Sequence, residues 1–255
     1  MVLAQVRTSP VAKMSDYAAE VQERVRRRGF PRFAESNVQE ILLTPGGPAQ
    51  LRVHPRWEFQ DRERTTGIIL TQNGVVLHTR AYDTFDAFAK HLALALEVVG
   101  EVVKPSLVER LGLRYVDLIR TEDGESWTDY VKPGLHGISD GAVGMHSSLH
   151  RSEIVGATEV GQLVVRCFQA SDGTFLPPDL VPSSLDHSSV LLRPEEVVTL
   201  LDLDHYSEAA REYDAEQVVE YMWRLHDNLD LSFRECVTDH ARKHWKAEER
   251  TEDAR

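Results

Sequence analysis

Residues 65–104, TTGIILTQNGVVLHTRAYDTFDAFAKHLALALEVVGEVVK, decide the fold class of this chain. Two runs rich in apolar and β-branched residues, 65–71 and 75–81, flank Gln72-Asn73-Gly74. Asn-Gly between two such runs predicts a β-hairpin. Apolar residues at three- and four-residue spacing then predict a long amphipathic helix over about 85–104. The segment therefore favours antiparallel strands that are covered by a helix.

The same order recurs in the second half of the chain. A predicted strand at 197–204 precedes a predicted helix at 214–237, and each of the two long helices opens with an aromatic residue followed by Asp. Either a degenerate duplication or chance would explain this repeated order of elements. Runs of strands followed by single long helices favour an α+β fold with a mostly antiparallel sheet that long amphipathic helices cover.

A change in composition divides the chain. Residues 121–150 are rich in Gly, Ser, Asp and His and show little periodicity. The pattern predicts an N-terminal α+β half at 1–122, a connection at 123–150, a C-terminal α+β half at 151–246 and a polar tail at 247–255. One compact unit is the alternative, since 255 residues also suit a single large domain.

Net charge separates the halves more sharply than hydrophobicity does. The whole chain carries 29 basic and 41 acidic side chains, a formal net charge of −12. Residues 1–127 hold 17 of each sign, whereas residues 128–255 hold 12 basic and 24 acidic groups. Phosphate backbones are held by clustered Lys and Arg, so nucleic acid is an unlikely partner. The acidic half favours a basic partner or a cation, with a plain solvated surface as the alternative.

Apolar segments and cysteines predict a cytoplasmic protein. The most apolar stretch, 92–103, is interrupted by Glu97 and Glu101, and no run reaches the ~18 apolar residues of a transmembrane helix. The first residues lack the apolar core of a secretory signal. Cys167 and Cys236 are single and far apart, which is typical of reduced, buried thiols.

The run GLRYVD at 112–117 is similar to the Gly-Leu-Arg-Tyr-x-Asn signature of an uncharacterised prokaryotic family of about 250 residues that is sporadically distributed. Asp117 stands at the Asn position, which keeps an acceptor and loses the amide donor. The resemblance implies a cytoplasmic bacterial or archaeal protein and no known activity. It extends to the following parts of the chain: Gln5 and Arg7, Trp57-Glu58-Phe59, and 201–206.

Charged residues inside this apolar strand are candidate site residues. Arg114 must snorkel, pair with a carboxylate or bind an anion. Asp117 has Arg7, or another Arg across the sheet, as a candidate partner. A buried ion-pair network, a ligand site formed by Arg114, Tyr115 and Asp117, and solvent exposure are therefore the three interpretations.

A second candidate is the carboxylate pair Asp202 and Asp204. On a strand, residues i and i+2 point to the same side, so both carboxylates could ligate Mg²⁺, as in enzymes of nucleotide or phosphate chemistry. The chain has no phosphate-binding motif to accompany the pair. The alternative is the solvent face of a strand with Leu201 and Leu203 turned inward.

A basic cluster lies at the predicted end of the first helix, where the helix dipole favours cations. It is a candidate surface for an acidic protein or for a second copy of the chain. A helix end without a partner is the alternative. The cluster consists of Arg24, Arg26, Arg27, Arg28 and Arg32.

Together these patterns favour a non-enzymatic protein-binding or regulatory module, with no catalytic residue and no cofactor. Its expected partner is a protein or a second copy of the chain, and neither a membrane nor nucleic acid. The alternative function is a metal-dependent enzyme that uses Asp202 and Asp204 with Mg²⁺.

Overall fold

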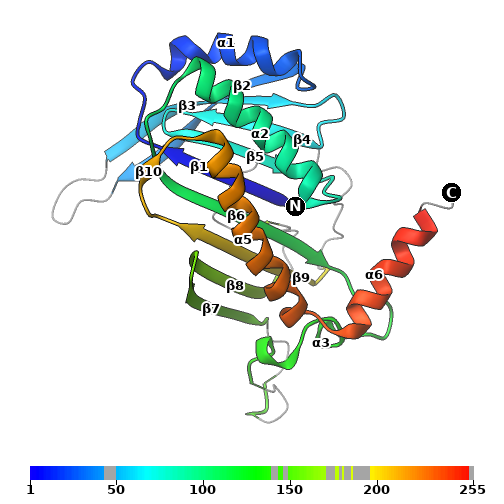
Figure 1. The fold of residues 1–255 in the computed structure, drawn as a ribbon. Coiled ribbons are helices and arrows are strands. Elements are labelled where there is room, and N and C mark those ends of the chain that lie inside the picture. The colour runs from blue at the N-terminus through cyan, green and yellow to red at the C-terminus, as the bar shows by residue number, and fades with distance from the viewer. Residues whose placement is uncertain are drawn as a thin grey trace. The chain divides into compact units, whose positions relative to one another are not determined.

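The computed structural model describes residues 1–42, 50–138, 143–145, 149–170, 176–177, 180, 185 and 196–252. It shows an α+β fold with a ten-stranded antiparallel sheet (Figure 1). The strands are β1 (Val2–Thr8), β2 (Arg32–Leu42), β3 (Gln50–Gln60), β4 (Thr66–Thr71), β5 (Gly74–Thr79), β6 (Leu107–Ile119), β7 (Arg151–Thr158), β8 (Gly161–Ala170), β9 (Val198–Ser207) and β10 (Arg211–Glu212). Their hydrogen-bonding order is β2-β3-β4-β5-β1-β6-β9-β8-β7, and β10 pairs with β6.

The helices are α1 (Met14–Arg26), α2 (Phe85–Val102), α3 (Trp127–Tyr130), the 3₁₀ helix η1 (Pro133–Leu135), α5 (Ala215–Cys236) and α6 (Asp239–Glu252). None of the helices in the described part of the chain combines the length and the apolar character needed to cross a membrane.

The chain forms two compact units. The first consists of Met1–Leu113, Pro182–His187 and Tyr206–Arg224, and the second of Arg114–Val181, Ser188–His205 and Leu225–Arg255. Strands β6 and β9 and helix α5 contribute residues to both units. The division falls inside β6, and the connection predicted at 123–150 lies within the second unit.

The β4–β5 hairpin organises the first unit. Thr71 pairs with Gly74 across the turn, which confirms the hairpin predicted from Asn73-Gly74. Strand β1 continues the sheet beside β5, with Val6 opposite Val75. Helix α2 contacts β5, and α1 contacts both β3 and α2. The buried side chains on these elements include Val6, Phe59, Leu77, Leu92 and Leu96.

Short-range capping positions the helices of the second unit. Ser126 and Asp129 form a capping box at the start of α3, within the connection that the sequence predicts at 123–150. Helix α6 then runs to Glu252, through residues that composition favours as a polar tail. The Thr238 hydroxyl accepts a hydrogen bond from the Ala241 amide near the start of α6. Ala241 itself is fully buried. Tertiary contacts therefore help to hold this helix, which has little apolar surface.

Candidate functional site

A buried ion pair between neighbouring strands is the most constrained polar feature of the second unit. Arg114 on β6 donates from Nε to Asp202 Oδ1 at 2.6 Å and from Nη2 to Oδ2 at 2.7 Å. The two side chains are 6% and 0% exposed. Two parallel, charge-assisted hydrogen bonds of this kind fix both direction and register. The structure therefore places Arg114 in an ion pair within the sheet.

The ion pair continues toward the sheet edge through Arg166 on β8. Its Nη1 lies 3.2 Å from Asp202 Oδ2, and its Nε donates to Glu153 on β7 at 2.5 Å. Burial would lower the pKa of Arg166, but hydrogen bonds to Glu153 and Asp202 raise it above its usual value. Two guanidinium groups thus share one buried carboxylate, and a second carboxylate at the exposed end completes the charge balance.

Tyr115, the next residue of the GLRYVD run, contacts helix α5. The Tyr115 hydroxyl lies 3.0 Å from His226 Nδ1 on α5, and burial lowers the pKa of His226. The predicted partner of Asp117, Arg7, faces Glu109 at 4.0 Å and Glu208 at 3.9 Å instead. Asp202 thus acts on both Arg114, through hydrogen bonds, and Asp117, through its charge, whereas the Tyr115 hydroxyl contacts His226.

Asp117 carries a cost that the signature Asn would remove. Burial raises the pKa of Asp117 most strongly; the positive charge of the N-terminus lowers it, and the negative charge of Asp202 raises it, so that the net shift is upward. A raised folded-state pKa penalises folding above that pKa, and the penalty disappears as the pH falls toward the unfolded-state value. We expect Asp117→Asn to raise the melting temperature at pH 7 by ~2–4 °C, or about 1 kcal/mol.

Thermal unfolding followed by circular dichroism at pH 7 and near pH 4 measures this effect. The advantage of Asp117→Asn should shrink to about half or less at the lower pH, where an unfolded Asp is itself about half protonated. Asp227→Asn removes the same charge from an exposed position on α5 and is the matched control. A melting temperature for Asp117→Asn at or below that of the control at pH 7 would contradict the prediction.

The surroundings of Asp202 and Asp204 on β9 do not resemble those of a metal site. Asp202 was expected either to ligate a cation or to face solvent, but it is fully buried and both its oxygens accept from arginines. Asp204 is only partly buried. The positive charges of Arg114 and Arg166 oppose the approach of a cation. Among the described residues, no three His, Cys, Asp or Glu side chains are grouped to hold a metal ion.

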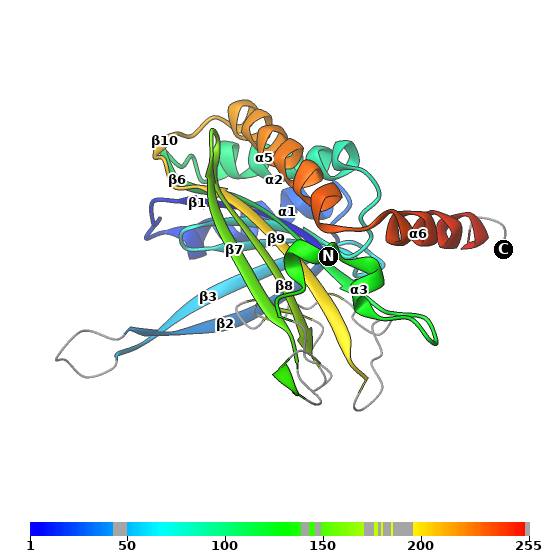
Figure 2. The ribbon, with the colours of Figure 1, turned by 90° about the horizontal axis from the view of Figure 1, so that it is seen from below.

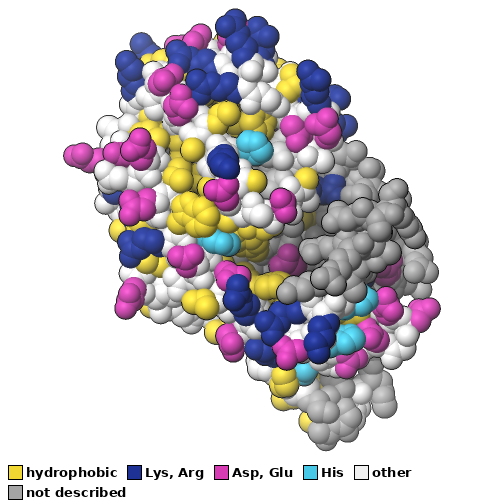
Figure 3. Space-filling model, turned by 45° about the vertical axis from the view of Figure 1, so that its right-hand side comes forward, with side chains coloured by type: hydrophobic (Ala, Val, Ile, Leu, Met, Phe, Trp, Pro, Cys, Tyr) yellow, Lys and Arg dark blue, Asp and Glu magenta, His cyan; other side chains and the backbone are white. Residues whose placement is uncertain are grey.

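The basic cluster at and beyond the end of α1 is interleaved with glutamates. Figure 3 shows Lys and Arg side chains gathered at the top of the view with acidic side chains among them. Arg24 pairs with Glu20 and Glu101, Arg26 and Arg27 with Glu23, and Arg28 with Glu97. Arg32 donates instead to the Arg62 carbonyl at 2.8 Å. Four of the five arginines thus pair with carboxylates, and two of these carboxylates, Glu97 and Glu101, lie on α2. The pairing reduces the positive electrostatic potential that the sequence predicted for this surface.

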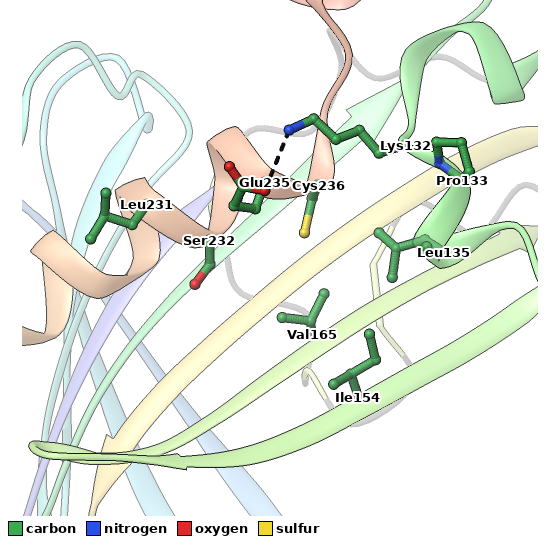
Figure 4. Close-up of a pocket in the computed structure, with 10 residues that line it drawn as sticks. Lys132, Pro133, Leu135, Ile154, Val165, Leu231, Ser232, Glu235 and Cys236 are labelled. Carbon is green, nitrogen blue, oxygen red and sulfur yellow. Dashed lines mark ion pairs between the residues drawn. The ribbon is translucent and has the colours of Figure 1, made fainter.

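An apolar cavity in the second unit was not predicted. It has a volume of about 530 Å³ and lies between η1, the end of α5 and the β7–β8 hairpin (Figure 4). Its apolar walls include Leu135, Ile154, Val165 and Leu231. These residues come from different elements, and in the sequence each fits the apolar pattern of its own helix or strand. No local pattern therefore predicts the cavity.

Lys132 and Glu235 lie at the side of the cavity, with Lys132 Nζ 3.6 Å from a Glu235 carboxylate oxygen (Figure 4). The Lys132 amide donates to the Cys236 carbonyl at 2.8 Å, which holds this residue against the end of α5. Cys236 also lines the cavity, and burial raises the pKa of its thiol to about 11. The inner wall is therefore uncharged at neutral pH, and the ionic groups stay at the rim.

Among the described strands of this unit, β7 lies at the edge (Figure 2). It pairs with β8 in the register Ile154↔Val165 and Val155↔Val164. Both Ile154 and Val155 are 52% exposed, and most of the strand is open to solvent. An exposed edge strand that carries large apolar side chains is a template for pairing with another chain.

The chain matches no family model, no curated protein and no solved structure. The similarity of residues 112–117 to a prokaryotic family signature therefore stays a prediction, and the geometry of the described residues carries the functional argument.

Proposed function

We propose that this chain is a protein-binding or regulatory module whose partner adds an extended strand to β7. The exposed apolar edge of β7 is the observation that carries this proposal. Strand addition supplies main-chain hydrogen bonds for affinity, and the alternate side chains of the added strand supply specificity.

The backbone groups available for such pairing follow from the register. Partners in an antiparallel pair alternate between hydrogen-bonded and non-hydrogen-bonded positions. The Gln169 amide donates to the His150 carbonyl at 2.9 Å, and this pair continues the β7–β8 register. Counting in steps of two from His150, the even-numbered residues of β7 are the ones that form hydrogen bonds with β8. The odd-numbered residues, Val155 among them, therefore direct their N–H and C=O groups away from β8.

The opposite edge of the sheet differs in character. Strand β2 carries the charged or polar side chains Arg32, Glu35, Ser36 and Asn37 within its first six residues, and charged and polar side chains discourage edge-to-edge pairing. The run Ile154–Ala157 in β7 has no charged residue over four positions. This contrast favours β7 as the edge that accepts a partner.

The charge of the second half favours a basic partner. Residues 128–255 carry 12 basic and 24 acidic side chains, so a second copy would bring repelling charge. A segment that has apolar side chains at alternate positions and Lys or Arg at its flanks fits β7 better. We therefore favour a heterologous basic strand over self-association.

We also propose that the protein acts in the cytoplasm and that its two halves arose by duplication. Cys167 and Cys236 are both buried free thiols, which suits a reducing compartment. The order β1, α1, β2 to β5, α2 in the first half parallels β6, α3, β7 to β9, α5 in the second. This parallel order supports a duplication in which long amphipathic helices close each half.

A proline at an outward-facing position tests strand addition. Val155→Pro removes one outward N–H, and proline is tolerated on edge strands, so the β7–β8 ladder should survive. Val155→Thr keeps the β-branched shape and the N–H and is the matched control. A partner captured by the wild-type protein from its host should bind Val155→Pro at least about tenfold more weakly and Val155→Thr within about twofold.

The melting temperatures of both variants establish that the fold is intact. Binding of Val155→Pro with unchanged affinity, or a stoichiometric partner that is lost only on substitution within the α1 arginines, would contradict pairing at β7.

A further inference from the structure

We propose that the apolar cavity of the second unit binds a medium-chain carboxylate, with its alkyl chain between α5 and the β7–β8 hairpin and its carboxylate at Lys132. This ligand site is separate from strand addition and does not depend on it.

The walls of the cavity favour an alkyl chain. Leu135, Ile154 and Val165 offer aliphatic side chains from two structural layers, and Leu231 of α5 is 62% exposed to the open side. The volume of about 530 Å³ lies within the range of small-molecule sites. Burial of this surface by a ligand would remove apolar area from water, and each methylene that becomes buried tightens binding about fourfold.

The polar groups inside the cavity do not call for a polar ligand. The Ser232 hydroxyl donates to the Asn228 carbonyl at 2.7 Å, within its own helix. The Cys236 thiol stays neutral because burial raises its pKa. The interior therefore accepts an apolar group without leaving a charged protein atom unpaired.

The rim supplies one cation for a ligand head group. Lys132 and Glu235 are 37% and 83% exposed, and exposed pairs of this kind contribute little to stability. A ligand carboxylate can thus replace Glu235 beside the Lys132 ammonium at small cost. The bridge between Val131 and Val237 and the bond from the Lys132 amide to the Cys236 carbonyl hold the Lys132 main chain at the end of α5, beside the cavity.

Two rim variants should move affinity in opposite directions. We expect isothermal titration calorimetry to show that decanoate binds about fivefold more tightly than decan-1-ol and far more tightly than hexanoate. Lys132→Met keeps the alkyl stem and should abolish the preference for decanoate over decanol. Glu235→Gln removes the competing carboxylate and should tighten decanoate binding while leaving decanol unchanged.

A third variant adds bulk to the lining of the cavity. Gly134 lines it, and a Cβ at this position would meet no heavy atom within 4 Å, so Gly134→Phe can place its ring in open space. This variant should lose decanoate binding at least tenfold while melting within a few degrees of the wild-type protein.

Several outcomes would overturn the proposal. These are no binding of decanoate to the wild-type protein, equal affinity for decanoate and decanol, or full binding to Gly134→Phe. Tighter binding of N-acetyl-Leu-Leu than of decanoate would assign the cavity to a peptide C-terminus and would overturn the acyl ligand. Since Val155 is not among the residues that line the cavity, failure here leaves the strand-addition test unaffected.

Discussion

Asp202→Ala is expected to lower the free energy of unfolding by ~3–5 kcal/mol, because it leaves the buried Arg114 guanidinium without its carboxylate. Removal of one member of a buried pair exposes the other to the full desolvation cost. Arg166, 28% exposed, can turn toward water or keep Glu153, but Arg114, at 6%, cannot reach solvent without opening the strand pair.

Urea denaturation of the wild-type protein and three variants measures this expectation. Arg114→Met combined with Asp202→Leu replaces the pair by apolar side chains and should recover most of the loss, because both desolvation costs disappear together. Arg234→Ala breaks an exposed pair with Asp230 on α5 and should cost no more than ~0.5 kcal/mol. A loss for Asp202→Ala as small as that of Arg234→Ala would show that the buried pair does not hold the strands.

Gly74→Ala is expected to destabilise the first unit by about 3 kcal/mol. Gly74 begins β5 with φ of +155°, a conformation that residues with a Cβ rarely adopt. A Cβ there would lie 2.3 Å from the Val6 carbonyl oxygen and 3.0 Å from the Arg7 Cα, both of which are backbone atoms. The hairpin and its pairing with β1 must therefore shift, in addition to the backbone strain of ~1–3 kcal/mol.

Gly134→Ala is the matched control for this prediction. Its Cβ would meet no heavy atom within 4 Å, so the expected change is below about 1 kcal/mol. The two variants are compared by urea unfolding monitored through tryptophan fluorescence. If both changed stability equally, the close approach of β1 to Gly74 would not be a constraint on the fold.

Local chemistry explains which elements were predictable. The β4–β5 hairpin depends on Asn73-Gly74 and its flanking β-branched residues, which are adjacent in the chain. Helix α2 begins after Thr84, whose side chain accepts from the Ala87 amide, and the short helix α3 begins with its own capping box. Each of these signals acts over only a few residues, so the sequence contains all of its physical causes.

Helix α6 extends through residues 247–252, which composition alone favours as part of a polar tail. Its residues are mostly charged, and charged stretches without an apolar stripe are typical of tails. The helix depends on buried Ala241 and on the aromatic contacts of Tyr130 with His240 and His244. Tyr130 lies more than a hundred positions earlier in the chain, so no window of the sequence around α6 contains these contacts.

The sequence by itself determined the α+β class, the hairpin, the start of α2 and the excess of acid in residues 128–255, because these follow from neighbouring residues or from simple counts. Only the tertiary structure decided the partner of Arg114, the pairing of Arg24 with Glu101 and of Arg28 with Glu97, the exposed edge of β7 and the cavity beside Lys132. Arg114 and Asp202 are 88 positions apart, and charge pairing depends on distance in space. Strand order and helix packing set that distance, and residue type alone does not.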